Sequence, residues 1–125
     1  MAVPILKQAD VLIAMVQAAL SDDDLLRLRD DLAAQIGRQR SRGVVLDVSA
    51  LDVLDSFATR TIRGIAYTAK LRGADTVVVG IQPEVAFAMV QLGLTLEGVS
   101  TALDLEEGLE VLKRRRETGK PNDAG

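Results

Sequence analysis

Two short runs of β-branched residues constrain the fold of this chain more than any other feature. Residues 44–48 (VVLDV) and residues 76–81 (TVVVGI) are nearly continuous in apolar character and lack the alternation of a strand with one solvent-facing side. Strands of this kind are covered on both faces, as in parallel sheets packed between helices. The chain has no Trp, one Tyr and two Phe, so its core must be aliphatic, which suits such a layered α/β fold.

The first forty residues predict a pair of strands and a helix. Residues 3–6 and 11–16 are apolar and are separated by a polar break at residues 7–10, which suits a hairpin turn. Residues 21–24 (SDDD) then supply a capping hydroxyl and carboxylates for a first helical turn. We expect this helix to end among the arginines and the glycine of residues 38–43.

Three further helices are predicted after the buried strands. Ser56 opens the first and Gly73 ends it, and the second runs from a proline at position 83 to a glycine at position 93. Asp104 and Glu107 have the spacing of a capping box ahead of the third. Residues expected to face the core are Ala58, Ile62, Ile65, Ala69, Val85, Met89, Leu92, Leu105, Leu109 and Leu112.

These elements add up to an α/β domain of order ββαβαβαβα, with an antiparallel pair first, parallel strands afterwards and about four helices. Residues 96–103 are a weaker segment with the character of an edge strand. We expect one domain over residues 1–117, a polar, flexible tail over residues 118–125, and one sheet face less covered by helices than the other.

Composition excludes several classes of function. The chain has neither Cys nor His, so disulfides, thiolate or histidine metal sites and Ser-His-Asp triads cannot form within it. The net charge is −3 and the basic residues form no continuous stripe along the sequence, which argues against nucleic acid or polyphosphate partners. No apolar run approaches membrane length and no leader pattern opens the chain, so we expect a cytoplasmic protein with no membrane association.

The loop at residues 49–56 is the most informative stretch, because it follows a central strand at the edge where open α/β sheets place their sites. Three interpretations stay open on residue types alone. In the first, Ser56 only caps a helix, and Asp52 and Asp55 are solvated turn residues. In the second, the carboxylates of Asp47, Asp52 and Asp55 bind magnesium. In the third, Ser56 is phosphorylated, which suits the positive end of a helix.

Phosphorylation of Ser56 would change the surface without disrupting the fold. The phosphate adds about −1.5 to −2 charges next to Asp52 and Asp55. If Leu54 or Phe57 is exposed, it offers an apolar contact that a partner buries, and a phosphate within that contact must be desolvated. We expect Thr59 and Thr61 to be helix-surface or packing residues, since they lie on other helical turns.

Residues 46–57 (LDVSALDVLDSF) resemble the phosphorylation motif of STAS domains, which anti-anti-sigma factors share. Residues 4–7 (PILK), 79–86 (VGIQPEVA) and 101–109 (TALDLEEGL) narrow the resemblance to the RsbS group of that family. The four segments occur in the right order, and the resemblance covers nearly the whole chain. It implies a single, non-catalytic STAS domain without cofactor or metal.

The resemblance also implies partners. Members of the RsbS group are implied to assemble with RsbR-type paralogues into the stressosome, a large complex, and to hold an RsbT-type switch kinase there. Phosphorylation of the serine matching Ser56 releases the kinase, and an RsbX-type phosphatase resets it. The single phosphorylation site agrees with residues 86–90 (AFAMV), which lack a hydroxyl, and with the absence of a sensory domain ahead of the first strand. The implied partner-binding residues are Asp52, Leu54, Asp55, Phe57 and Arg60.

Two rival functions remain. The chain could be a freestanding anti-anti-sigma factor that binds an anti-sigma kinase through the same serine. It could also be a small magnesium-dependent enzyme that uses Asp47, Asp52 and Asp55.

Overall fold

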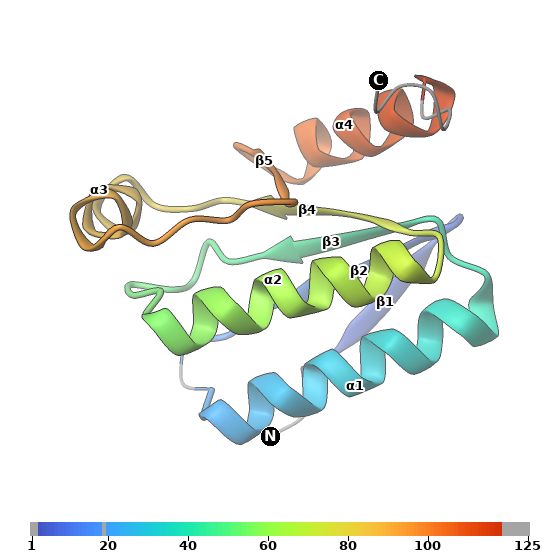
Figure 1. The fold of residues 1–125 in the computed structure, drawn as a ribbon. Helices are drawn as coiled ribbons and strands as arrows, with labels where there is room; N and C mark the ends of the chain where they lie inside the picture. Colours follow the sequence, from blue (N-terminus) through green and yellow to red (C-terminus); the bar gives the residue numbers. More distant parts are fainter. Residues whose placement is uncertain (1–2, 19, 119–125) are drawn as a thin grey trace.

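The computed structural model describes residues 3–18 and 20–118, and within them the chain forms a five-stranded mixed sheet (Figure 1). β1 and β2 are antiparallel, whereas β2, β3, β4 and β5 pair in parallel. This pairing confirms the predicted topology, and the spatial order of the strands equals their order in the sequence. The strands are β1 (Ile5–Gln8), β2 (Val11–Met15), β3 (Gly43–Asp47), β4 (Asp75–Val79) and β5 (Ser100–Ala102).

Helices cover the two faces of the sheet unequally. α1 and α2 lie side by side on one face, α4 lies on the other, and α3 lies beyond the end of β4 (Figure 1). All four helices begin at the carboxyl end of the parallel strands, because each follows a strand and returns. The helices are α1 (Asp22–Gln39), α2 (Ser56–Leu71), α3 (Pro83–Leu92) and α4 (Leu105–Thr118).

The central strands are buried on both faces, as their sequence predicts. Val44 and Leu46 point into the large core beneath α1 and α2, and Val45 between them points into the smaller core beneath α4. All three side chains are fully buried. On the α4 side, Leu6 and Met15 remain 59% and 53% exposed, which confirms that one sheet face is less covered.

Capping residues set the helix ends, and several predicted bounds shift by a few residues. Ser21 caps α1 and forms the reciprocal capping box with Asp24. The helix stops at Arg40, which adopts the left-handed conformation (φ 52°), so Gly43 belongs to β3 and does not end the helix. The predicted turn at residues 7–10 is shorter than expected, because β1 extends through Gln8 and pairs with Val11.

The last helix also begins on carboxylates. Asp104 Oδ1 accepts from the Glu107 amide at 2.9 Å, and Glu107 Oε1 accepts from the Leu103 amide at 2.8 Å, one residue earlier than in a standard capping box. α4 continues to Thr118, one residue beyond the predicted end of the domain, and the flexible tail stays a prediction. Its residues 119–125 lie outside the described residues.

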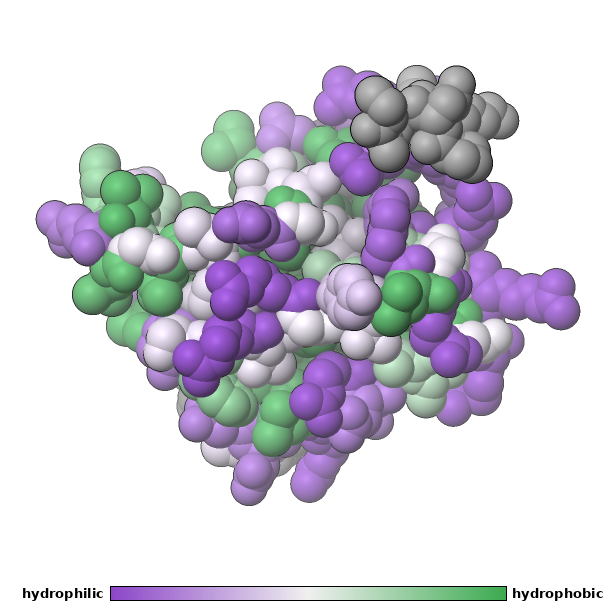
Figure 2. All heavy atoms as spheres, viewed as in Figure 1, coloured by the Kyte–Doolittle hydropathy of each residue, from purple (hydrophilic) through white to green (hydrophobic). Residues whose placement is uncertain are grey.

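α3 differs from its prediction on one face. Pro83 opens it, Gly93 ends it in the left-handed conformation (φ 69°), and Val85 and Met89 are buried as expected. Leu92, which we expected to face the core, is 69% exposed because α3 lies at the margin of the sheet, where only one side of the helix meets other elements. Figure 2 shows apolar side chains gathered over this helix, and Phe87 and Val90 are among them.

Within the described residues, none of the helices combines the length and the apolar character that crossing a membrane requires.

Candidate functional site

The loop that carries Ser56 is held by short contacts from β3 to α2. The Asp47 carboxylate accepts hydrogen bonds from the amide and the hydroxyl of Ser49, at 2.9 and 2.7 Å. Gln82 Nε2 donates to the Ser49 carbonyl at 2.8 Å and so ties the loop to the start of α3. Gly80 (φ +83°) is required here, because a Cβ at this position would come within 2.8 Å of the Ser49 Cβ. The loop therefore has a defined shape and lies against the turn before α3.

The N-cap of α2 is Asp55, and Ser56 is the first residue of the helix. The backbone of Asp55 is extended (φ −80°, ψ −179°), and its Oδ1 accepts from the Ala58 amide at 2.8 Å. The interpretation of Ser56 as the cap is therefore wrong by one residue, since an aspartate fills the same role one position earlier. Ser56 does open the helix, as predicted.

Because Asp55 caps the helix, the Ser56 hydroxyl has no structural role. The side chain is exposed, and its hydroxyl makes no hydrogen bond to the described part of the chain. The amides of Ser56 and Phe57 begin the helix and likewise lack a described acceptor, as is usual in a first turn. A phosphate on Ser56 would thus meet two free N–H donors on one side and the Asp55 carboxylate on the other.

The predicted partner-binding residues divide into exposed and buried ones. Asp52, Asp55 and Arg60 are exposed, and Phe57 is half-buried. Leu54 is only 4% exposed and packs in the core beneath α1 and α2, so its predicted contact with a partner is corrected. Val53 is the large apolar residue of the loop that faces outward, at 68% exposed, and the sequence interpretation missed it.

The neighbouring threonines are packing residues, which was one of their two predicted roles. Thr59 and Thr61 are 1% and 8% exposed. Their hydroxyls donate to backbone carbonyls one helical turn earlier, those of Asp55 and Phe57, both at 2.8 Å. Ser56 is therefore the accessible hydroxyl in the first two turns of α2.

The carboxylates near Ser56 do not converge on a common point. Asp47 is engaged by Ser49, Asp55 caps α2, and Asp52 faces solvent. Among residues 3–18 and 20–118, no three carboxylates are grouped so that they could hold a metal ion. The magnesium-enzyme alternative has no site in this part of the chain.

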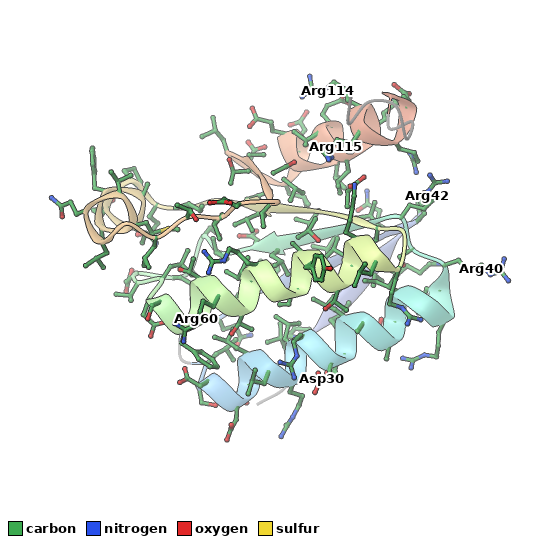
Figure 3. The ribbon with its side chains drawn as sticks, in the orientation of Figure 1. Asp30, Arg40, Arg42, Arg60, Arg114 and Arg115 are labelled. Atoms are coloured by element: carbon green, nitrogen blue, oxygen red, sulfur yellow. The ribbon has the colours of Figure 1, made fainter. Side chains whose placement is uncertain are left out.

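This end of the molecule is strongly acidic. α1 and α2 begin here on one face of the sheet and α4 on the other, and the first turns and caps of all three carry carboxylates. Arg60, on the second turn of α2, is the labelled arginine at this end in Figure 3. We call this region the acidic end, and its carboxylates are Asp22, Asp23, Asp24, Asp52, Asp55, Asp104, Glu106 and Glu107.

The fold and this site match a known class. The family model of the STAS domain matches residues 2–116. The chain therefore belongs to the STAS-domain family.

Within that family the chain is similar to solved stressosome proteins, one of them an RsbS. A solved serine-to-glutamate variant of RsbS from Moorella thermoacetica is 37% identical, with a TM-score of 0.79 over 92% of this chain and 97% of that one. A chain from the solved stressosome, described as a signal integration and transduction hub, is 39% identical, with a TM-score of 0.75 over 89% of this chain and 96% of that one.

A curated relative is the RsbT co-antagonist protein RsbRA of Bacillus subtilis, which is 30% identical over 84 residues. The matched region is 67% of this chain and 31% of RsbRA. The matched region thus spans about a third or less of the co-antagonist relatives RsbRA, RsbRD and RsbRC.

Proposed function

We propose that this chain is a non-catalytic antagonist of an RsbT-type serine/threonine switch kinase, which it holds until the kinase phosphorylates Ser56. The exposed Ser56 hydroxyl in the first turn of α2, left free because Asp55 caps the helix, is the observation that carries this proposal. The 37% identity to RsbS over nearly the whole chain supports it. The family's regulatory anti-sigma-antagonist members agree with a role without catalysis.

The contact with the kinase would be formed by groups around the serine. Val53 is exposed, Phe57 is half-buried, and Asp52 and Arg60 flank them on the surface. This gives a small apolar centre with charged neighbours, the usual composition of a regulatory contact.

Phosphorylation releases the partner by local electrostatics. The phosphate brings about −1.5 to −2 charges to a surface that already carries Asp52 and Asp55. It lies next to the apolar Val53 and Phe57, so a partner that buries these side chains must also desolvate the phosphate. The free Ser56 and Phe57 amides stabilise the phosphate within the subunit, so the fold survives while the contact is lost.

The proposed assembly includes RsbR-type paralogues, as in a stressosome, and an RsbX-type phosphatase that removes the phosphate. The 39% identity to a stressosome chain supports co-assembly. α3 carries no hydroxyl between Ala86 and Val90, which supports a single phosphorylation site.

The test is reconstitution of the full chain with an RsbT-type kinase, ATP and magnesium. We expect one phosphate, located on Ser56 by mass spectrometry of fragments, and loss of kinase co-elution in size-exclusion chromatography. Ser56→Ala should keep the kinase bound. The matched control is Thr101→Ala, which removes an exposed hydroxyl on β5 and should behave as the parent. Phosphate at another residue, with Ser56 unmodified, contradicts the proposal.

The same chromatography separates the stressosome role from a freestanding anti-anti-sigma factor. Addition of an RsbR-type paralogue should move the chain into a very large particle. Persistence of a monomer or dimer that binds an anti-sigma kinase would support the freestanding role.

A further inference from the structure

An open groove of about 480 Å³ lies at the end of the molecule opposite Ser56, between the last turns of α1 and α2. We call it the arginine groove. Figure 3 shows Arg40 and Arg42 leaving this end of the molecule, far from Arg60 at the other. The polar residues that line the groove are Arg40, Ser41, Arg42 and Arg72, and the apolar Ile36 and Leu71 line it beside them.

The positive charges of this groove are not neutralised within the described residues. Arg40, Arg42 and Arg72 form no ion pair with a carboxylate of residues 3–18 or 20–118. The basic side chains nearer to α4 are paired instead: Lys70 and Arg115 with Asp75, and Arg116 with Asp10. The unpaired guanidinium groups are therefore concentrated on the α1–α2 side.

A buried hydroxyl lines the same groove without a partner. Ser41 is only 4% exposed, and its Oγ makes no hydrogen bond. A buried polar atom with no partner in the protein is uncommon and calls for a physical explanation. The Oγ itself has almost no accessible surface, so the ligand contacts of the groove must come from its arginines.

Two backbone features place arginines here. Gly37 lies within α1, and the guanidinium of Arg72 occupies the space that a Cβ on Gly37 would need. Arg72 therefore reaches from the end of α2 onto α1. Arg40 has φ 52°, a conformation that usually selects glycine or asparagine at a helix end, yet the residue here is an arginine. Both features bring positive charge to the junction of the two helices.

The charge balance favours an anion despite the two helix carboxyl ends. Each helix end contributes about −0.5 of a charge, so two of them contribute about −1 against the three guanidinium charges. Much of the negative end is also satisfied, since the Ile36 carbonyl accepts from Ser41 and the Ala69 carbonyl accepts from Arg72 and Ala74. The positive charge of the three guanidinium groups therefore exceeds the negative charge of the two helix ends.

We propose that the arginine groove binds a phosphate-class oxyanion, either on a small metabolite or on a phosphorylated side chain. Guanidinium groups donate paired, charge-assisted hydrogen bonds to phosphate oxygens. The groove is open and large enough for a phosphate with an attached organic group. This site is independent of Ser56 and of the proposed kinase.

The primary test is a titration of the ¹⁵N-labelled full chain with inorganic phosphate, followed by NMR at constant ionic strength. We expect saturable shifts confined to the amides of residues 36–42 and 71–73. Arg72→Gln should weaken the affinity about tenfold or more, whereas Arg60→Gln, at the acidic end, should leave it unchanged. Shifts that do not saturate, or equal weakening by both variants, would overturn the proposal.

Two further variants exclude an effect through folding. Gly37→Ala should displace the Arg72 guanidinium and weaken phosphate binding several-fold, although alanine is the better helix former and should preserve or raise thermal stability. Arg40→Gln should weaken binding while leaving the fold intact, because the Arg40 side chain is exposed. If both variants bind phosphate as the parent does, the groove is not the site.

The source of the phosphate is resolved by a second probe, a short peptide that carries phosphoserine. Tighter binding of the peptide than of inorganic phosphate assigns the site to a phosphorylated side chain. Equal or weaker binding of the peptide assigns it to a small molecule, and the absence of binding by both probes overturns the site.

Discussion

The two ends of this domain are built from the same helices and have opposite chemistry. The acidic end holds the amino-terminal turns of α1, α2 and α4, an exposed serine and a loop with a defined shape. The arginine groove lies where α1 and α2 finish, about 24 Å away at 1.5 Å per residue along α2. Side-chain charges complement the helix dipoles at both ends. The difference teaches that a fold with parallel-running helices separates two candidate sites by charge as well as by distance.

The largest expected effect contrasts two adjacent loop residues at the acidic end. Leu54→Ala should lower the free energy of unfolding by about 2–5 kcal/mol, because it leaves a cavity in the core. Val53→Ala removes an exposed side chain and should change it by about 0.5 kcal/mol or less. Urea denaturation of both variants measures the contrast, and equal losses would mean that the loop packs differently.

The next effect tests whether partner binding belongs to one end only. Ser56→Asp should weaken binding of an RsbT-type kinase about tenfold, which is about 1.4 kcal/mol, because it adds negative charge beside Asp52 and Asp55. Arg40→Gln, at the other end, should leave that affinity unchanged. Isothermal titration calorimetry gives both values. If only Arg40→Gln weakened kinase binding, the kinase contact would lie at the arginine groove and not at the acidic end.

A smaller effect separates the cap from the proposed phosphorylation site. Asp55→Ala removes the side-chain acceptor for the Ala58 amide and should lower the free energy of unfolding by about 1 kcal/mol. Ser56→Ala should change it by about 0.5 kcal/mol or less. Thermal denaturation followed by circular dichroism compares them, and the reverse order would restore Ser56 as the cap.

The smallest effect tests the contribution of positive charges near the arginine groove. Asp75→Asn frees Lys70 and Arg115 and should change stability by about 0–1 kcal/mol, as is typical of surface ion pairs. It should also raise the affinity for inorganic phosphate about twofold, by a long-range Coulomb term. Repeating the NMR titration at high salt should abolish this gain. A gain that persists in high salt would indicate a structural change instead.

The order of elements was predictable because its signals are local. The β-branched runs of β3 and β4, the cap at Ser21, and the proline and glycine that bound α3 each act within a few residues. The strand pairing then follows from the rules that govern parallel connections. The loop before α2 was predicted less well, since Asp55 and Ser56 are both good caps and residue type does not choose between them.

Two features depended on tertiary placement. Side chains in a loop do not alternate or repeat in a regular pattern, as they do in a strand or a helix. The sequence therefore could not show that Leu54 faces the core and Val53 faces solvent. The arginine groove joins residues 40–42 to Arg72 across thirty positions, and the sequence shows these arginines only as separate groups. Their gathering results from the parallel course of α1 and α2, which the residue types do not encode locally.

The shared direction of α1, α2 and α4 also affects encounters in solution. The net charge of −3 determines the electrostatic field only at long range. Closer to the surface, the field is negative at the acidic end and positive at the arginine groove. An approaching cationic surface will rotate the domain one way and an anionic surface the other, before any contact is made. The fold therefore orients each end preferentially towards a binding partner of the opposite charge.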